Sequence, residues 1–142
     1  MHGPVGSFVF PVHPVERQFL FVAGGTGIAP LRSMIRHAFI TAQPGHLHLL
    51  YSARTPSDFA YLTELERYER EERLQLALTA TRAVPPRWSG EQGRITPQRL
   101  SSLIETPETL CFVCGPAAMV DDVPRMLLEL GIDRDRIRIE EW

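Results

Sequence analysis

The sequence contains no lysine, and all fifteen of its basic residues are arginine. A chain without lysine offers no side-chain amine for Schiff-base chemistry and no P-loop lysine, so those two classes of enzyme are excluded. Two cysteines are too few for a disulfide framework. The first residues also lack the basic start and long apolar segment of a secretory signal. We therefore expect a protein of the cytoplasm.

Long apolar runs and an excess of charge of one sign are missing as well. No uninterrupted apolar stretch approaches the roughly 20 residues that span a bilayer, and a formal net charge of −2 gives no broad attraction to nucleic acid or to anionic membranes. With 142 residues, 44% of them hydrophobic, the chain has the size of one ordinary domain with a proper core. We expect a domain that acts on a small molecule, with no nucleic acid partner and no membrane insertion.

What the sequence does contain is an alternation of short apolar strands and helices. Strands are expected at 19–23, 47–52, 74–81, 109–114 and 136–140, and helices at 30–39, 55–68, 97–103 and 117–130. The range 82–93 is rich in turn residues and is expected to be a loop. This alternation predicts an α/β fold, Rossmann-like, with a doubly wound five-stranded parallel sheet in the order 3-2-1-4-5 and helices on both faces. Pro124 should kink or interrupt the last helix.

Three glycines stand where the first expected strand meets the first helix, within the run Gly24 to Pro30. Glycines let the backbone turn tightly and approach a ligand, and the N-terminus of the following helix attracts an anion. The usual dinucleotide fingerprint has a third glycine where this chain has Pro30. The run is consistent either with a pyrophosphate-binding loop or with a tight turn that binds nothing. A crevice is expected beside it, between the first and fourth strands.

Two short patterns could indicate a metal site or a redox disulfide. Cys111 and Cys114 form a C-x-x-C string, but residues three apart on a strand point to opposite faces, and no second ligand pair follows at metal spacing. His46 and His48 would share one face, yet no further ligand cluster is visible. We expect no metal, with Cys111 in the core and Cys114 in the crevice.

Trp88 is expected to anchor its own loop rather than to stack on an adenine.

Five short motifs occur in a fixed order along the chain. They are Gly3-Pro4-x-Gly6-x-Phe8, Gly24 to Pro30, Tyr51-Ser52-Ala53-Arg54, Trp88-x-Gly90-x-x-Gly93-Arg94-Ile95 and Cys114-Gly115-Pro116-x-x-Met119. Together they resemble the NAD(P)-binding half of ferredoxin–NADP reductase-type flavoprotein oxidoreductases. The resemblance implies that residues 1–14 are the end of an FAD-binding barrel and that residues 15–142 are the NAD(P)-binding domain.

The resemblance also implies a reaction, in which NADP(H) or NAD(H) is positioned for hydride transfer to FAD and electrons continue to a ferredoxin or an oxygenase-type acceptor. FAD would require the missing barrel domain. Thr26 and Cys114 would be the catalytic residues beside the nicotinamide. Ser52 and Arg54 follow the second strand, where an arginine accommodates the 2′-phosphate of NADP, and Arg82 offers a second contact. The implied cofactor-binding residues are Gly24, Gly25, Thr26, Gly27, Ile28, Ala29, Pro30, Ser52, Arg54, Arg82, Cys114, Gly115, Pro116, Met119 and Trp142.

Two other functions remain open from the sequence. The chain could be a non-catalytic nucleotide-binding fragment, or a subunit that needs a separate flavin-bearing partner. It could also be a thiol-regulated domain in which Cys114 is reversibly oxidised.

Overall fold

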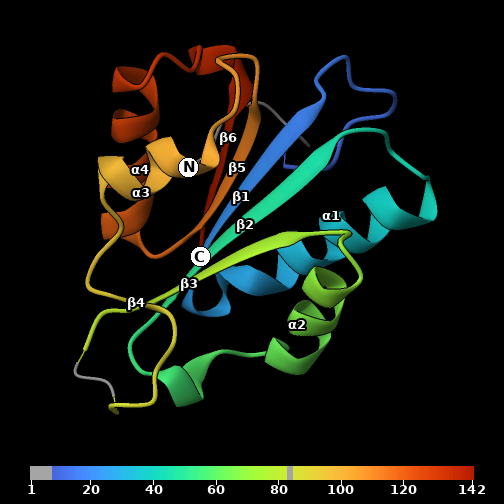
Figure 1. Ribbon diagram of the computed structural model, residues 1–142. Helices are drawn as coiled ribbons and strands as arrows, with labels where there is room; N and C mark the ends of the chain where they lie inside the picture. The colour runs from blue at the N-terminus through green and yellow to red at the C-terminus, as the bar shows by residue number, and fades with distance from the viewer. Residues whose placement is uncertain (1–7, 83–84) are drawn as a thin grey trace.

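A computed structural model describes residues 8–82 and 85–142 and arranges them in layers around one sheet (Figure 1). Within these residues the strands are β1 (Gln18–Gly24), β2 (His46–Ala53), β3 (Gln75–Ala80), β4 (Glu91–Gln92), β5 (Leu110–Gly115) and β6 (Ile137–Glu141). All neighbouring pairs are parallel, in the order β4-β3-β2-β1-β5-β6. Helices α1 (Ile28–Ile40) and α2 (Leu62–Arg70) cover one face, and α3 (Pro97–Leu103) and α4 (Ala117–Glu129) cover the other. The predicted α/β fold is confirmed.

The predicted number of strands, five, is wrong. Within the described residues a sixth strand, β4, pairs with the end of β3, so that Thr79 lies opposite Glu91 and Ala80 opposite Gln92. The order predicted as 3-2-1-4-5 therefore becomes 4-3-2-1-5-6. β4 lies in the range expected to be a loop. Two paired residues are too short to leave an alternating pattern among the surrounding turn residues.

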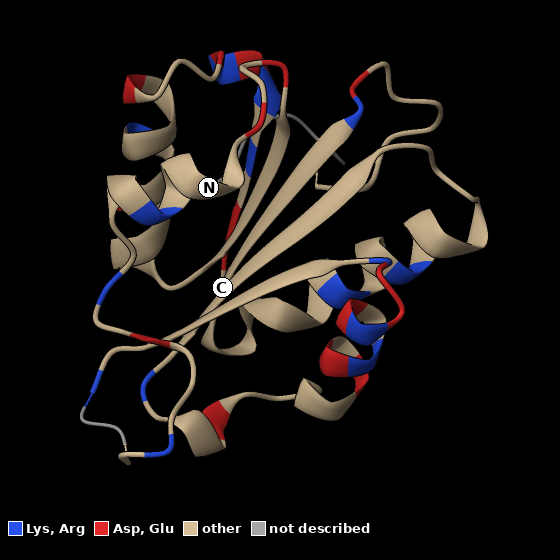
Figure 2. Cartoon of the chain, in the orientation of Figure 1, with Lys and Arg blue, Asp and Glu red and all other residues tan. Residues whose placement is uncertain are grey.

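The core strands carry apolar side chains on both faces because helices cover both sides of the sheet. Figure 2 shows β1 and β2 free of charged residues. Phe21 of β1 packs against Phe112 of β5 on the α1 side, with ring centroids 5.3 Å apart. Val22 belongs instead to the cluster under α3 and α4. The β1–β5 register brings the carboxyl ends of the two strands together, with Ala23 opposite Cys114.

The helix predicted over 55–68 is interrupted. It consists of a 3-10 turn (Pro56–Asp58) and α2, and between them Phe59 has an extended backbone and is buried. The interruption coincides with a contact to a neighbouring strand: the hydroxyl of Tyr51 on β2 accepts a hydrogen bond from the N–H of Ala60 at 2.9 Å. That bond satisfies a backbone donor outside the helix, so the chain can enter the core before α2 begins.

The proline inside the last helix does not interrupt it. α4 runs unbroken from Ala117 to Glu129, and Pro124 is buried within it beside Val123. Packing of the buried face against the sheet is the main source of helix stability in proteins and offsets the one backbone hydrogen bond that proline cannot make.

None of the helices in the described ranges is long and apolar enough to cross a membrane.

The histidine pair lies at the amino-terminal end of β2, away from the glycine loop. Nδ1 of His46 is 3.0 Å from Oε1 of Glu105, and Nε2 of His48 is 3.1 Å from Oε2 of the same carboxylate. Burial lowers the pKa of His48 below its ordinary value. In the part of the chain that the structure describes, no cluster of His, Cys, Asp or Glu could hold a metal ion. The pair serves to link β2 to the segment before β5.

The predicted domain boundary after residue 14 remains a prediction. Residues 1–7, which hold most of the first motif, lie outside the described residues. Phe10 is buried, with ring centroids 5.1 Å from Phe19 and 5.9 Å from Phe112. The described part of the 1–14 segment therefore packs on the core of the α/β domain.

Candidate functional site

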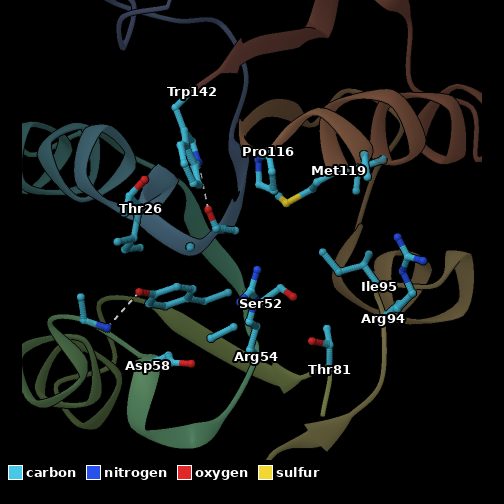
Figure 3. Close-up of a pocket in the computed structure, with 18 of the residues that line it drawn as sticks. Thr26, Ser52, Arg54, Asp58, Thr81, Arg94, Ile95, Pro116, Met119 and Trp142 are labelled. Atoms are coloured by element: carbon cyan, nitrogen blue, oxygen red, sulfur yellow. Dashed lines mark hydrogen bonds between the residues drawn. The ribbon is translucent and has the colours of Figure 1, made fainter.

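A cavity of about 960 Å³ opens at the carboxyl edge of the sheet. The loops after β1, β2, β3 and β5 line it together with α4 and the last residue, Trp142 (Figure 3). Its size is that of a cofactor pocket. In an open α/β sheet, ligands bind outside the carboxyl ends of the strands where the winding reverses. That point lies between β1 and β5 here, so the cavity is at the position predicted for the crevice.

The loop after β1 is a single 3-10 turn, Gly25–Gly27, that leads directly into α1. Gly25 has a φ of +56°, in the left-handed region that favours glycine. A Cβ on Gly24 would lie 2.5 Å from Sδ of Met119 in α4, so the Met119 side chain would have to move to admit it. Among the described residues no side chain caps the start of α1, and its first turn holds no acid. The backbone N–H groups there can receive an anion.

The loop after β5 is held against the glycine loop. A Cβ on Gly27 would lie 2.2 Å from the carbonyl oxygen of Cys114. Trp142 joins the two loops, because its backbone N–H donates to the carbonyl of Gly115 and its Nε1 donates to the carbonyl of Gly24, both at 3.2 Å. Trp142 itself remains 57% exposed at the mouth of the cavity. The two loops and Trp142 therefore form one connected wall.

The two predicted catalytic residues have different surroundings. Thr26 is exposed and lines the cavity (Figure 3). The side chain of Cys114 is 1% exposed, belongs to the core cluster that includes Phe112, and does not line the cavity. Burial, with a smaller contribution from Glu140, raises the pKa of the Cys114 thiol to about 11. A neutral, buried thiol is a poor redox sensor, which disfavours the thiol-regulated domain considered from the sequence.

Most of the predicted cofactor-binding residues meet at the cavity. Those that line it are Gly24, Gly25, Thr26, Ile28, Ala29, Ser52, Arg54, Arg82, Pro116, Met119 and Trp142. Gly27, Cys114 and Gly115 lie behind the wall, where they hold the two loops together. Pro30 faces a second, smaller cavity of about 440 Å³ next to Phe8. The individual roles of these residues in cofactor binding remain predictions.

Sequence reasoning missed several cavity residues on the side of β2, β3 and α4. They are Tyr51, Ala53, Asp58, Ala60, Tyr61, Thr81, Arg94, Ile95, Ala118, Asp122, Val123 and Met126. Arg94 and Ile95 belong to the motif that begins at Trp88, but the sequence analysis assigned no role in the site to either residue. Tyr61 has a left-handed φ of 60°, and the guanidinium of Arg32 lies 4.4 Å from its ring centroid. Only the structure reveals that backbone strain, which is typical of functional sites.

Trp88 anchors its own loop, as predicted. Its Nε1 donates to the carbonyl of Glu91 at 2.9 Å, and its ring stacks on Phe59 with centroids 5.6 Å apart. It packs against the core cluster and does not line the cavity. An adenine at the cavity would therefore not stack on this ring.

Comparison with known proteins identifies the family. Residues 21–125 match the family model of the oxidoreductase NAD-binding domain. Ferredoxin–NADP reductase B of Sorangium cellulosum is 34% identical over 99% of this chain and 60% of its own length. The glycine betaine monooxygenase reductase subunit of Chromohalobacter salexigens is 31% identical over 100% of this chain and 39% of its own.

A solved structure agrees with these sequence matches. The ferredoxin reductase in carbazole 1,9a-dioxygenase superposes with a TM-score of 0.80 at 27% identity and covers 99% of this chain and 41% of that one. The chain thus spans 60% or less of each of these three proteins. The resemblance drawn from the five motifs is confirmed: the chain belongs to the oxidoreductase NAD-binding domain family of ferredoxin–NADP reductase-type proteins.

Proposed function

We propose that this domain binds NAD(P)H in the cavity at the carboxyl edge of the sheet and orients its nicotinamide for hydride transfer to a flavin. One observation carries the proposal. The glycine turn, the uncapped start of α1 and the loop after β5 converge on a single cavity in a member of an NAD-binding family. An anion at the turn and an aromatic ring at the β5 side would then belong to one molecule.

The residues present fit a dinucleotide. Gly24 and Gly25 leave the backbone accessible at the centre of the cavity, where the pyrophosphate would contact the N–H groups that begin α1. From that centre the cavity extends in two directions, toward Ser52 and Thr81 on one side and toward Pro116 on the other (Figure 3). The adenosine half would occupy the β2–β3 side and the nicotinamide half the β5 side.

On the β5 side the chain offers orientation and exclusion of water. Pro116, Met119 and the ring of Trp142 form an apolar wall, and Thr26 adds a hydroxyl that can bond the ribose or the amide. The bound dinucleotide supplies the hydride. The residues of this chain hold its ring in one orientation and keep water from it, which is the protein's usual contribution to cofactor chemistry.

We propose that FAD is held by a separate domain or subunit, as the resemblance implies, and that electrons pass on to a ferredoxin or an oxygenase-type acceptor. Two relatives are a ferredoxin–NADP reductase and a monooxygenase reductase subunit, and their names support both kinds of acceptor. They favour a reductase over the non-catalytic fragment considered from the sequence. The greater length of these relatives leaves space for a flavin domain.

The isolated chain should bind one dinucleotide and no flavin tightly. The physical reason is that the cavity offers space for a pyrophosphate and for a nucleoside on either side of it, whereas the flavin site is expected on a barrel domain outside these 142 residues. Isothermal calorimetry with NADPH and with NADH, together with an absorption spectrum of the purified protein, checks this. Absence of heat with both dinucleotides, or a yellow protein with stoichiometric FAD, would contradict the proposed function.

A further inference from the structure

The sulfur atom of Met119 lies against both loops that border the cavity. Met119 stands in the first turn of α4 and lines the cavity, with its sulfur beside Pro116 (Figure 3). A Cβ on Gly24 would lie 2.5 Å from Sδ of Met119, and a Cβ on Gly115 would lie 2.7 Å from the same atom. The thioether therefore fills the space that side chains at these two glycines would take. One sulfur packs on the last residue of β1 and on the last residue of β5.

Two other methionines of the described residues have different surroundings. Met126 lies seven residues further along α4, on the same face of the helix, and lines the same cavity. It is not among the atoms nearest to an added Cβ on either glycine. Met34 of α1 is 6% exposed and belongs to the core cluster next to the smaller cavity. Met126 is therefore a matched control for the contact that Met119 makes.

The two cysteines compete poorly for an oxidant. Burial raises the pKa of the Cys111 thiol to about 12, and burial together with Glu140 raises the pKa of the Cys114 thiol to about 11. Peroxides oxidise the thiolate, and at neutral pH almost none of either cysteine is in that form. A methionine thioether has no proton to lose before it reacts. Oxidation that reaches the cavity therefore meets a thioether first.

We propose that Met119 is a site of oxidative modification, at which hydrogen peroxide converts the thioether to a sulfoxide and thereby weakens dinucleotide binding. The inference rests on the proposed function. A lone pair of the sulfur forms an S–O bond to one peroxide oxygen while the O–O bond breaks. The proton on the transferred oxygen passes to the other oxygen, which leaves as water. The sulfur is oxidised and the peroxide is reduced.

A sulfoxide at Met119 conflicts with both the loops and the ligand. Because Gly24 and Gly115 already contact the sulfur, the new oxygen takes the direction of the cavity, or the side chain leaves the glycines and enters the cavity itself. Either change places a polar group in the apolar wall that Met119 forms with Pro116 and Trp142. The product is more polar than the thioether and no longer suits an apolar contact. The space for the nicotinamide half of the dinucleotide is reduced.

Titrations before and after peroxide treatment test the inference. The peroxide is removed with catalase, and calorimetry uses the dinucleotide that the untreated chain binds more tightly. Affinity of the wild-type chain should fall at least about tenfold, the usual effect of burying an unpaired polar group. Met119→Leu has no sulfur there, so treatment should leave its affinity within about twofold of its own untreated value. Met126→Leu should lose as much affinity on treatment as the wild-type chain.

Peptide mass spectrometry identifies the modified sulfur in the wild-type chain. The sulfoxide should accumulate at Met119 before it appears at the buried Met34. The oxidised form of the dinucleotide should slow this reaction, because the bound ligand covers the wall that holds the sulfur. Incubation with the two methionine sulfoxide reductases and dithiothreitol should restore affinity, whereas dithiothreitol alone should not.

The possible outcomes separate the inference from the proposed function. Equal losses in treated Met119→Leu and treated wild-type chain, or complete sulfoxidation of Met119 without loss of affinity, would overturn the inference and leave the proposed function standing. The reductase experiment needs no variant, so failure of the reductases to restore affinity would also overturn it. If the untreated wild-type chain binds neither dinucleotide, the proposed function itself fails.

Discussion

Thr26→Asp should weaken dinucleotide binding strongly and leave the domain folded. Thr26 is exposed in the turn that precedes α1. A carboxylate there interacts favourably with the helix dipole, by about 0.3–1 kcal/mol, so the melting temperature should hold or rise. The same carboxylate would repel the pyrophosphate. Two like charges about 4 Å apart cost on the order of 4 kcal/mol near a protein surface, so affinity should fall by at least about a hundredfold in a calorimetric titration.

Thr26→Asn is the matched control for that substitution. Its side chain has nearly the shape of Asp but carries no charge, so we expect NADPH affinity within about threefold of wild type. Equal losses in the Asn and Asp variants would mean that the shape of residue 26, rather than charge at the start of α1, controls binding. Unchanged affinity in Thr26→Asp would place the anion elsewhere in the molecule.

Gly27→Ala should destabilise the domain by about 3 kcal/mol, at the upper end of the usual cost of overpacking. The φ of Gly27 is −62°, which alanine adopts freely, so the effect comes from space alone. A Cβ would lie 2.2 Å from the carbonyl oxygen and 2.6 Å from the carbonyl carbon of Cys114, in the backbone of a central strand that cannot move easily. Urea unfolding should show a lower midpoint, and NADPH binding should be lost because the two loops separate.

A substitution at a second glycine, Gly131, separates the effect of a steric clash from the effect of replacing glycine by alanine in general. At Gly131, within the described structure, no heavy atom lies within 4 Å of an added Cβ, but the φ is +98°. Gly131→Ala should therefore cost about 1 kcal/mol through backbone strain and leave NADPH affinity unchanged. A smaller loss of stability in Gly27→Ala than in Gly131→Ala would contradict the close contact between the loops.

The part of the site near β1 could be predicted because its signals are local. A buried strand reads as a continuous apolar run, and the glycines that end it mark both the turn and the anion-binding helix start. The burial of the Cys114 side chain could not be predicted from such local signals. It lies two residues after Phe112 on β5, so both side chains face the same core, and only the register with β1 reveals that this face is closed.

The rest depends on hydrogen bonds that join different elements of the fold. The break before α2 follows from a hydrogen bond between Tyr51 and Ala60, which no local helix propensity contains. The position of Arg94 follows from the hydrogen bonds that tie its loop to Arg99 and Thr79. Hydrogen bonds from side chains to backbone carbonyls in loops leave no periodic pattern, so the side of the cavity next to β2 and β3 could not be assembled from the sequence.

Chemical-shift mapping of the isotope-labelled domain during an NADPH titration tests most directly whether one dinucleotide lies between the two loops. We expect the largest amide shifts together at Gly25 and Thr26 in the loop after β1, at Met119 beyond β5 and at Thr81 after β3. Residues at the opposite edge, such as His46, should not move. Largest shifts at that opposite edge, or shifts confined to one of the two loops, would contradict a dinucleotide bound across the cavity.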